Sequence, residues 1–130
     1  MDLDNVKKDV FGFNISDTII SNNPNLASEF HYRLINWIND FHRALDADHE
    51  VGLQLVTFGE KTTFHVEDIG YWNPSLISFI GKTEKGDPVE LVQHVSQISL
   101  LLVKMKNLYS GKPKNPIGFA TWEEFDKQKK

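Results

Sequence analysis

Apolar residues recur at helical spacing in one long stretch that begins after residue 23. Asn23 has a side chain suited to capping a helix, and Pro24 suits the first helical position, where its missing N–H costs nothing. The pattern therefore predicts one long N-terminal helix that runs from Pro24 to about Asp46. Its apolar stripe consists of Ala27, Phe30, Leu34, Trp37, Ile38, Phe41 and Leu45.

From Glu50 the apolar pattern changes to strict alternation, which is typical of a strand with one buried face. The alternation predicts strands over residues 50–58 and 61–69, joined by a tight turn at Gly59-Glu60. The next segment, Tyr71-Trp72-Asn73-Pro74, breaks the pattern because proline cannot donate a hydrogen bond to a neighbouring strand. We expect this segment to form a loop with exposed aromatic side chains.

Two further apolar runs, residues 76–81 and 89–95, flank the turn-forming residues 84–87 and predict a second hairpin. After Ser96 the apolar positions return to helical spacing. We therefore expect a second helix, over about residues 98–109, that packs on the sheet. Its apolar positions are Ile98, Leu101, Leu102, Met105 and Leu108.

The length of 130 residues suits one domain with a substantial core, whereas two full domains would not fit. We expect an α+β fold with a long N-terminal helix, an antiparallel sheet of about four strands, a C-terminal helix and an extended tail. The predicted organisation is an N-terminal arm over residues 1–22, a single α+β domain over 23–110 and an extended C-terminal tail over 111–130.

The formal charge of -4 arises from 14 Lys+Arg against 18 Asp+Glu, and Arg33 and Arg43 are the two arginines. Phosphate backbones require a broad positive field, so this charge argues against a nucleic-acid polymer as the partner. The sequence has no cysteine, which excludes disulfides and cysteine-ligated metal sites. No apolar run approaches the roughly 20 residues that span a bilayer, and we expect a cytoplasmic protein without a membrane contact.

Two segments are candidates for a binding surface. The expected aromatic loop offers ring faces that can stack on a base or anchor a partner. The expected junction of the last strand with the second helix is dense in hydrogen-bond donors and acceptors. These segments predict a site for a protein partner or a small nucleotide-like ligand. The candidate residues are Tyr71, Trp72, Asn73, Gln93, His94 and Gln97.

A metal site is the alternative interpretation. His65 and Glu67 are two residues apart on one face of a predicted strand, and His94 comes near them if the last strand pairs alongside. A His/Glu/His set suits zinc or manganese in a small metal-assisted hydrolase; otherwise we expect no cofactor. His31 and His42 are roughly 16 Å apart along one helix, so they cannot share a metal, and we expect them to be solvated.

Three stretches together resemble an uncharacterised domain-of-unknown-function family of bacteria and prophages. They are residues 23–30 (NPNLASEF), 65–77 (HVEDIGYWNPSLI) and 93–97 (QHVSQ), and the segment Ile117-Gly118-Phe119 looks like the short ending of that family. The resemblance covers residues 23–119. It implies a cytosolic bacterial or phage protein, and it implies no activity.

The sequence contains no glycine-rich phosphate loop, GxSxG elbow or HExxH motif, which favours a binding protein over an enzyme. We therefore expect a non-enzymatic, oligomeric binding protein, in a phage setting one that interferes with host defence signalling. We also expect the tail residues Ile117 and Phe119 to dock on a neighbouring subunit of a homo-oligomer.

Overall fold

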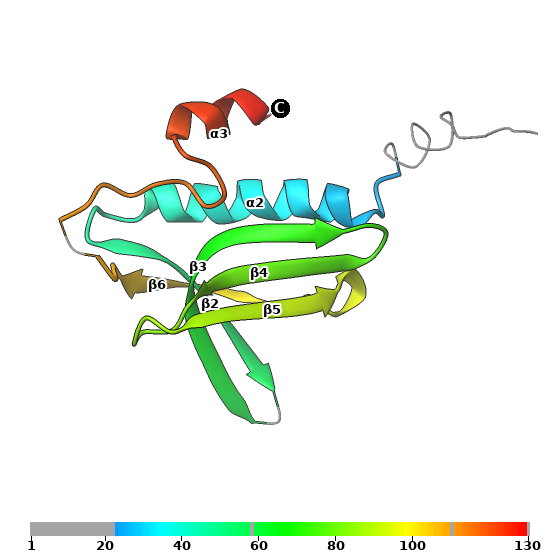
Figure 1. Cartoon of the computed structure of the whole chain (residues 1–130), viewed down its shortest axis with the longest axis horizontal. Coiled ribbons are helices and arrows are strands. Elements are labelled where there is room, and N and C mark those ends of the chain that lie inside the picture. The colour runs from blue at the N-terminus through cyan, green and yellow to red at the C-terminus, as the bar shows by residue number, and fades with distance from the viewer. Residues whose placement is uncertain (1–22, 58, 110, 130) are drawn as a thin grey trace, which may run out of the picture.

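Five antiparallel strands form one sheet in the computed structural model, which describes residues 23–57, 59–109 and 111–129 (Figure 1). In chain order the elements are α2 (Ala27–Ala44), β2 (His49–Thr57), β3 (Glu60–Trp72), β4 (Leu76–Lys82), β5 (Pro88–His94), the short 3-10 helix η1 (Val95–Gln97), β6 (Leu101–Lys106) and α3 (Trp122–Gln128). The strand order is β5-β4-β3-β2-β6. Helix α2 covers one face of the sheet, and α3 lies on the outer side of α2 (Figure 1).

The α+β class and the antiparallel sheet are confirmed, but the sheet has five strands instead of the predicted four. The predicted N-terminal arm, residues 1–22, lies outside the described residues.

Helix α2 begins later and ends earlier than the long helix predicted over residues 24–46, and it has 18 residues. The Leu26 N–H donates to the Asn23 carbonyl at 3.3 Å, which places Pro24 in a turn before the helix. The N-cap residue is Leu26, whose side chain makes no capping hydrogen bond. The exposed N–H groups of the first helical turn must therefore find acceptors elsewhere in the chain.

The buried face of α2 is rotated relative to the predicted apolar stripe. Ile35, Asn39 and His42 are buried, whereas Trp37 is 73% exposed. The prediction was wrong at Trp37 because it counted apolar residues alone. Asn39 and His42 are tolerated inside because both donate to carbonyls of residues 111–121, the segment before α3 that we call the strap.

The first predicted hairpin is confirmed. Strands β2 and β3 pair from Gly52 opposite His65 to Thr57 opposite Glu60. The turn uses Gly59 at φ 81°, a left-handed conformation that glycine adopts without a steric penalty.

Strand β3 continues three residues beyond its predicted end because it pairs with β4 as far as Trp72 opposite Leu76, and it contains a bulge. The pairing with β4 shifts register between Val66 and Asp68, so one residue is inserted there. The insertion brings Ile69 and Tyr71 back to the side of the sheet that carries Val66. The expected loop at 71–74 is therefore wrong for Tyr71 and Trp72, which are strand residues.

The second hairpin is also confirmed, with Ile77 and Phe79 of β4 buried against α2 and Gly86 at φ 89° in the turn. The connection from β3 to β4 is short, and its Asn73–Pro74 peptide bond is cis.

Strand β6 replaces the helix that was predicted over residues 98–109. It pairs antiparallel with β2, from Leu101 opposite Gln54 to Lys106 opposite His49. The spacing of the apolar residues suited a helix, but a short apolar run suits a strand equally well. Pairing decides between them, because β6 satisfies the edge of β2 that would otherwise be open.

The C-terminal tail folds back on its own chain. Ile117 is buried, its N–H donates to Asn39 Oδ1 at 2.6 Å, and its carbonyl accepts from Asn39 Nδ2 at 3.0 Å. Phe119 contacts Phe125 of α3 with ring centroids 5.6 Å apart. The expectation that Ile117 and Phe119 dock on a neighbouring subunit is therefore wrong, and the expected extended tail ends in a helix.

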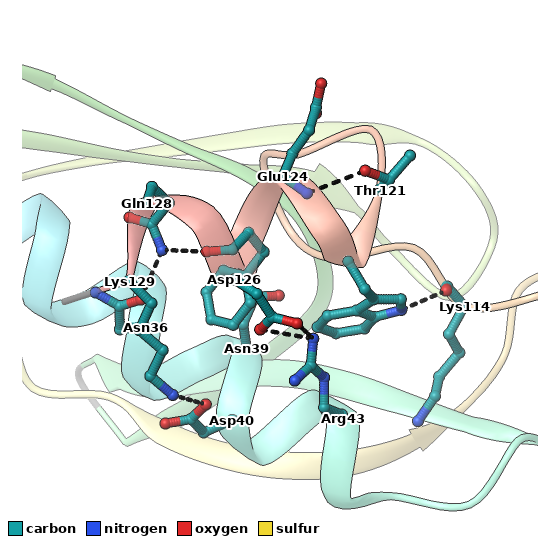
Figure 2. A network of polar contacts seen from close by, with 12 residues as sticks. Asn36, Asn39, Asp40, Arg43, Lys114, Thr121, Glu124, Asp126, Gln128 and Lys129 are labelled. Carbon is teal, nitrogen blue, oxygen red and sulfur yellow. Dashed lines mark hydrogen bonds and ion pairs between the residues drawn. The ribbon is translucent and has the colours of Figure 1, made fainter.

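Helix α3 is held against α2 by one buried ring and a border of polar contacts (Figure 2). Phe125 is fully buried. Around it, Asp126 pairs with Arg43 at 3.1 Å and Lys129 pairs with Asp40 at 2.6 Å. Helix α3 thus forms a third layer over the face of α2 that points away from the sheet (Figure 1). The strap runs beside α2 and reaches β3, where the Gly118 N–H donates to the Glu67 carbonyl at 3.2 Å.

Candidate functional site

The fold brings the six candidate binding residues to one end of the sheet, which we call the aromatic corner. The end of β3, the connection to β4 and the β5–η1 junction meet there. Leu76 is the register partner of both Trp72 in β3 and His94 in β5. The Val95 N–H donates to the Ser75 carbonyl at 2.8 Å, which ties the junction to the connection.

Asn73 caps helix α2 from outside the helix. Its Oδ1 accepts from the Ser28 N–H at 2.8 Å, and the Ala27 N–H donates to the Pro74 carbonyl at 2.8 Å. These two bonds supply acceptors for the first turn, where the N-cap Leu26 supplies none. The structure thus gives Asn73 a structural role.

Two of the other candidates, Tyr71 and His94, also make internal contacts. Tyr71 packs against His31 of α2 with ring centroids 5.0 Å apart, and His94 Nδ1 accepts from the Ser96 N–H at 3.1 Å to cap η1. Gln93 lies on the side that faces α2, opposite Ile77, and its buried Oε1 has no hydrogen-bond partner among the described residues. Gln97 is exposed at the end of η1.

Trp72 differs from these residues because its indole is 77% exposed. Its side chain lies on the outer face of the sheet, away from α2, directly opposite Leu76. Val92 shares this face through its pairing with Ser78, and both Leu76 and Val92 are exposed. The outer face of the aromatic corner is therefore an apolar strip that no described residue covers.

The residues of the alternative metal site do not come together. His65 is the register partner of Lys82 and His94 is the partner of Leu76, at opposite ends of β4, which places them about 20 Å apart. Glu67 is exposed at the bulge, 3.6 Å from Lys82 Nζ. In residues 23–57, 59–109 and 111–129, no three His, Asp or Glu side chains gather closely enough to hold a metal ion.

A cavity of about 590 Å³ lies between the strap and strands β2 and β3. His65 is only 3% exposed, and its Nδ1–H donates a hydrogen bond to the carboxylate of Glu50. Both residues line the cavity. Sequence reasoning missed Glu50, which is 15 residues from His65. The hairpin register was the available signal, because it sets His65 opposite Gly52, two residues from Glu50.

His42 lines the same cavity as a neutral imidazole with both nitrogens in use. Its Nε2–H donates to the Asn115 carbonyl at 3.0 Å, and its Nδ1 accepts from the Val51 N–H at 3.2 Å. Burial lowers the pKa of His42 from 6.5 to about 4. The expectation of solvated histidines is wrong for His42, and His31 is also engaged, through a 2.7 Å bond from Nε2–H to the Ile69 carbonyl.

Two lysines near the cavity have shifted pKa values. The Lys114 ammonium donates to the carbonyls of His42 and Leu45 at 2.7 and 2.8 Å, and its burial lowers its pKa. Lys82 donates to the Tyr109 hydroxyl at 3.0 Å, and this hydrogen bond, together with the nearby Glu67 carboxylate, raises the pKa of Lys82.

Comparison with family models matches residues 22–120 to one family, described as a family of unknown function (DUF6173). No curated protein and no solved structure matches the chain. The matched range contains the aromatic corner and all of the strap except Thr121, and it does not include α3. None of the helices in the described residues has the length and apolar character to cross a membrane.

Proposed function

We propose that this chain, which belongs to the family of unknown function DUF6173, is a non-enzymatic binding protein. It recognises a protein partner through the outer face of the aromatic corner. The exposure of Trp72 carries the proposal. An exposed tryptophan beside other apolar side chains is typical of the centre of a protein interface.

The surroundings of Trp72 support binding without rearrangement. Asn73 and Pro74 are tied to the start of α2, and Trp72 itself pairs with Leu76 in the sheet. A side chain held on a rigid scaffold loses little conformational entropy when a partner covers it. An apolar strip on a sheet face suits an apolar protein surface better than a charged ligand.

The bacterial or phage setting and the cytoplasmic location implied by the sequence resemblance extend the proposal. In that setting, occupation of the aromatic corner would block a component of host defence signalling. If the protein partner is a second copy of this chain, the resulting complex is a homo-oligomer.

The test compares two exposed tryptophans. Trp72→Ala should weaken partner binding about 30-fold or more, since truncation of an interface tryptophan typically costs about 2 kcal/mol or more. Trp37→Ala is the matched control, because Trp37 is 73% exposed on α2, away from the corner. Proteins captured from cells of the source organism by the wild-type chain are purified, and the Kd of each binary complex is measured with all three chains.

Sedimentation velocity of the same three chains tests whether the partner is a second copy. Loss of a dimer in Trp72→Ala, with the dimer retained in Trp37→Ala, would identify self-association through the corner. Equal affinities of the two variants for every captured partner, and equal sedimentation, would overturn the proposal.

A further inference from the structure

We propose that residues 11–15 of this chain, which lie outside the described residues, dock into an apolar groove beside α2. The groove has a volume of about 310 Å³ and lies between α2 and residues 98–102, where β6 begins. It is separate from the outer face of the aromatic corner, so the inference does not depend on the proposed function. The six residues that line the groove are all apolar: Leu34, Trp37, Ile38, Ile98, Leu100 and Leu102.

The groove belongs to an apolar stripe of α2 that the sheet covers only in part. Phe30, Leu34, Trp37 and Phe41 follow one another at helical spacing, but none of them is buried, and Trp37 is 73% exposed. Trp37 and Phe41 also line a second hollow, of about 630 Å³, so the apolar surface continues along the helix. A contiguous apolar surface of this kind marks a contact site.

The sequence that precedes α2 contains a segment that matches the groove in composition. Residues 11–16, FGFNIS, carry no charge, and apolar residues alternate in them with small or polar ones. In an extended chain this alternation places Phe11, Phe13 and Ile15 on one side. The lining of the groove has no charged residue either, so it suits apolar side chains and offers no ion pair to a charged ligand.

The segment is long enough to reach the groove. Helix α2 rises by about 15 Å from Ala27 to Trp37. An extended chain covers about 26 Å over the eight residue steps from Ile15 to Asn23. Covalent attachment gives the segment an effective concentration at the groove that is roughly millimolar, so modest contacts suffice for docking.

The start of the described chain and the charge on α2 agree with this path. The Arg33 guanidinium donates to the Pro24 carbonyl at 2.9 Å, which keeps the chain before α2 on the side of the helix that carries Arg33 and Trp37. Arg33 pairs with no carboxylate of the described residues. Asp17, two residues after Ile15, is a carboxylate that would pass Arg33 as the chain runs from the groove to Pro24.

A spin label next to the proposed contacts tests the docking. The chain has no cysteine, so Ser16→Cys carries a single nitroxide. In ¹⁵N-labelled protein, the Trp37 indole resonance should lose most of its intensity relative to the same protein with the nitroxide reduced. Trp72 is the internal reference, because its indole lies on the outer face of the sheet, away from α2, and it should lose much less. Equal losses at the two indoles would overturn the proposal.

Substitutions in the segment test which residues dock. The triple change Phe11→Ser, Phe13→Ser and Ile15→Ser in the spin-labelled chain should restore the Trp37 intensity. The matched control is Leu3→Ser with Val6→Ser, which makes the same kind of change outside residues 11–15 and should keep the loss. An undiminished loss in the triple variant, or a restored signal in the control, would contradict the assignment of residues 11–15.

A mixed sample separates docking within one chain from exchange between chains. The spin-labelled chain without ¹⁵N is combined with ¹⁵N-labelled wild type, and the Trp37 indole should keep its intensity. A loss at Trp37 in this sample would mean that a second copy of the chain fills the groove, and docking within one chain would then be wrong.

Discussion

At the residue scale, His42 shows how a titratable group can be part of a core. Its two nitrogens serve one donor and one acceptor of the backbone, so the neutral ring is fully satisfied. A proton on Nδ1 would point at the Val51 N–H, which is itself a donor. The folded protein therefore resists protonation of this ring, in line with its lowered pKa.

This arrangement predicts a loss of stability in mild acid. The folded-state pKa of His42, about 4, lies below the unfolded value of 6.5, so the unfolded chain takes up the proton first. The stabilisation is complete above pH 6.5 and is lost as the pH falls toward 4. We expect the free energy of unfolding to fall by about 1–2 kcal/mol between pH 7.5 and pH 5, measured by urea denaturation.

His42→Gln isolates this effect, because every other titratable group remains. The variant should be less stable at pH 7.5, and the additional loss on going to pH 5 should be smaller than in the wild type by the same 1–2 kcal/mol. Parallel pH dependences of the two chains would contradict the assignment.

At the element scale, helix α2 depends on a cap from a distant loop. Asn73→Ala removes the acceptor for the Ser28 N–H, which should lower the free energy of unfolding by about 0.5–2 kcal/mol. Asn73→Asp is the conservative comparison, since a carboxylate keeps the acceptor and its charge is favourable at a helix N-terminus. The measurement is urea denaturation together with the hydrogen-exchange rate of the Ser28 amide.

Faster exchange at Ser28 in Asn73→Ala, and near-wild-type exchange in Asn73→Asp, is the expected pattern. Equal stability and equal exchange in all three chains would show that Asn73 does not cap the helix.

The elements that periodicity identified were those in which one face is apolar and the other polar. Strands β2 and β3 were predicted for this reason, whereas β4 and β5 were predicted as apolar runs on either side of the turn-forming residues 84–87. The turns contain Gly59 and Gly86. Strand β6 was missed because an edge strand with apolar residues on both faces has no period of two. Its identity depends on pairing with β2, which is a long-range property.

The candidate site was predictable in part for a similar reason. The residues of the aromatic corner could be predicted because they are adjacent in two short segments of the sequence. Which of them have a structural role and which are exposed is seen only from contacts in the folded chain, such as those of Asn73 and Tyr71. The Glu50–His65 pair was missed because it depends on hairpin register. Glu67 lines the same cavity as His65, but it pairs with Lys82, and His94 lies at the other end of β4.

At the scale of the whole molecule, the strap and α3 make the C-terminus part of the core. Two kinds of contact hold α3: the buried ring of Phe125, and ion pairs at the surface such as Lys129 with Asp40 (Figure 2). Burial of a phenylalanine contributes far more free energy than an exposed ion pair, whose charges are already well solvated before folding. The two contributions can be separated by mutation.

Phe125→Ala should lower the free energy of unfolding by about 3 kcal/mol or more, because it leaves a cavity against Phe119 and removes the ring beneath the Arg43 guanidinium. Lys129→Ala, in the same helix, should change it by less than about 1 kcal/mol. Urea denaturation of both variants measures the difference, and hydrogen exchange at Ile117 should accelerate in Phe125→Ala alone, since Phe125 packs against Phe119 of the strap. Equal effects of the two substitutions would mean that the polar border, and not the buried ring, attaches α3 to the domain.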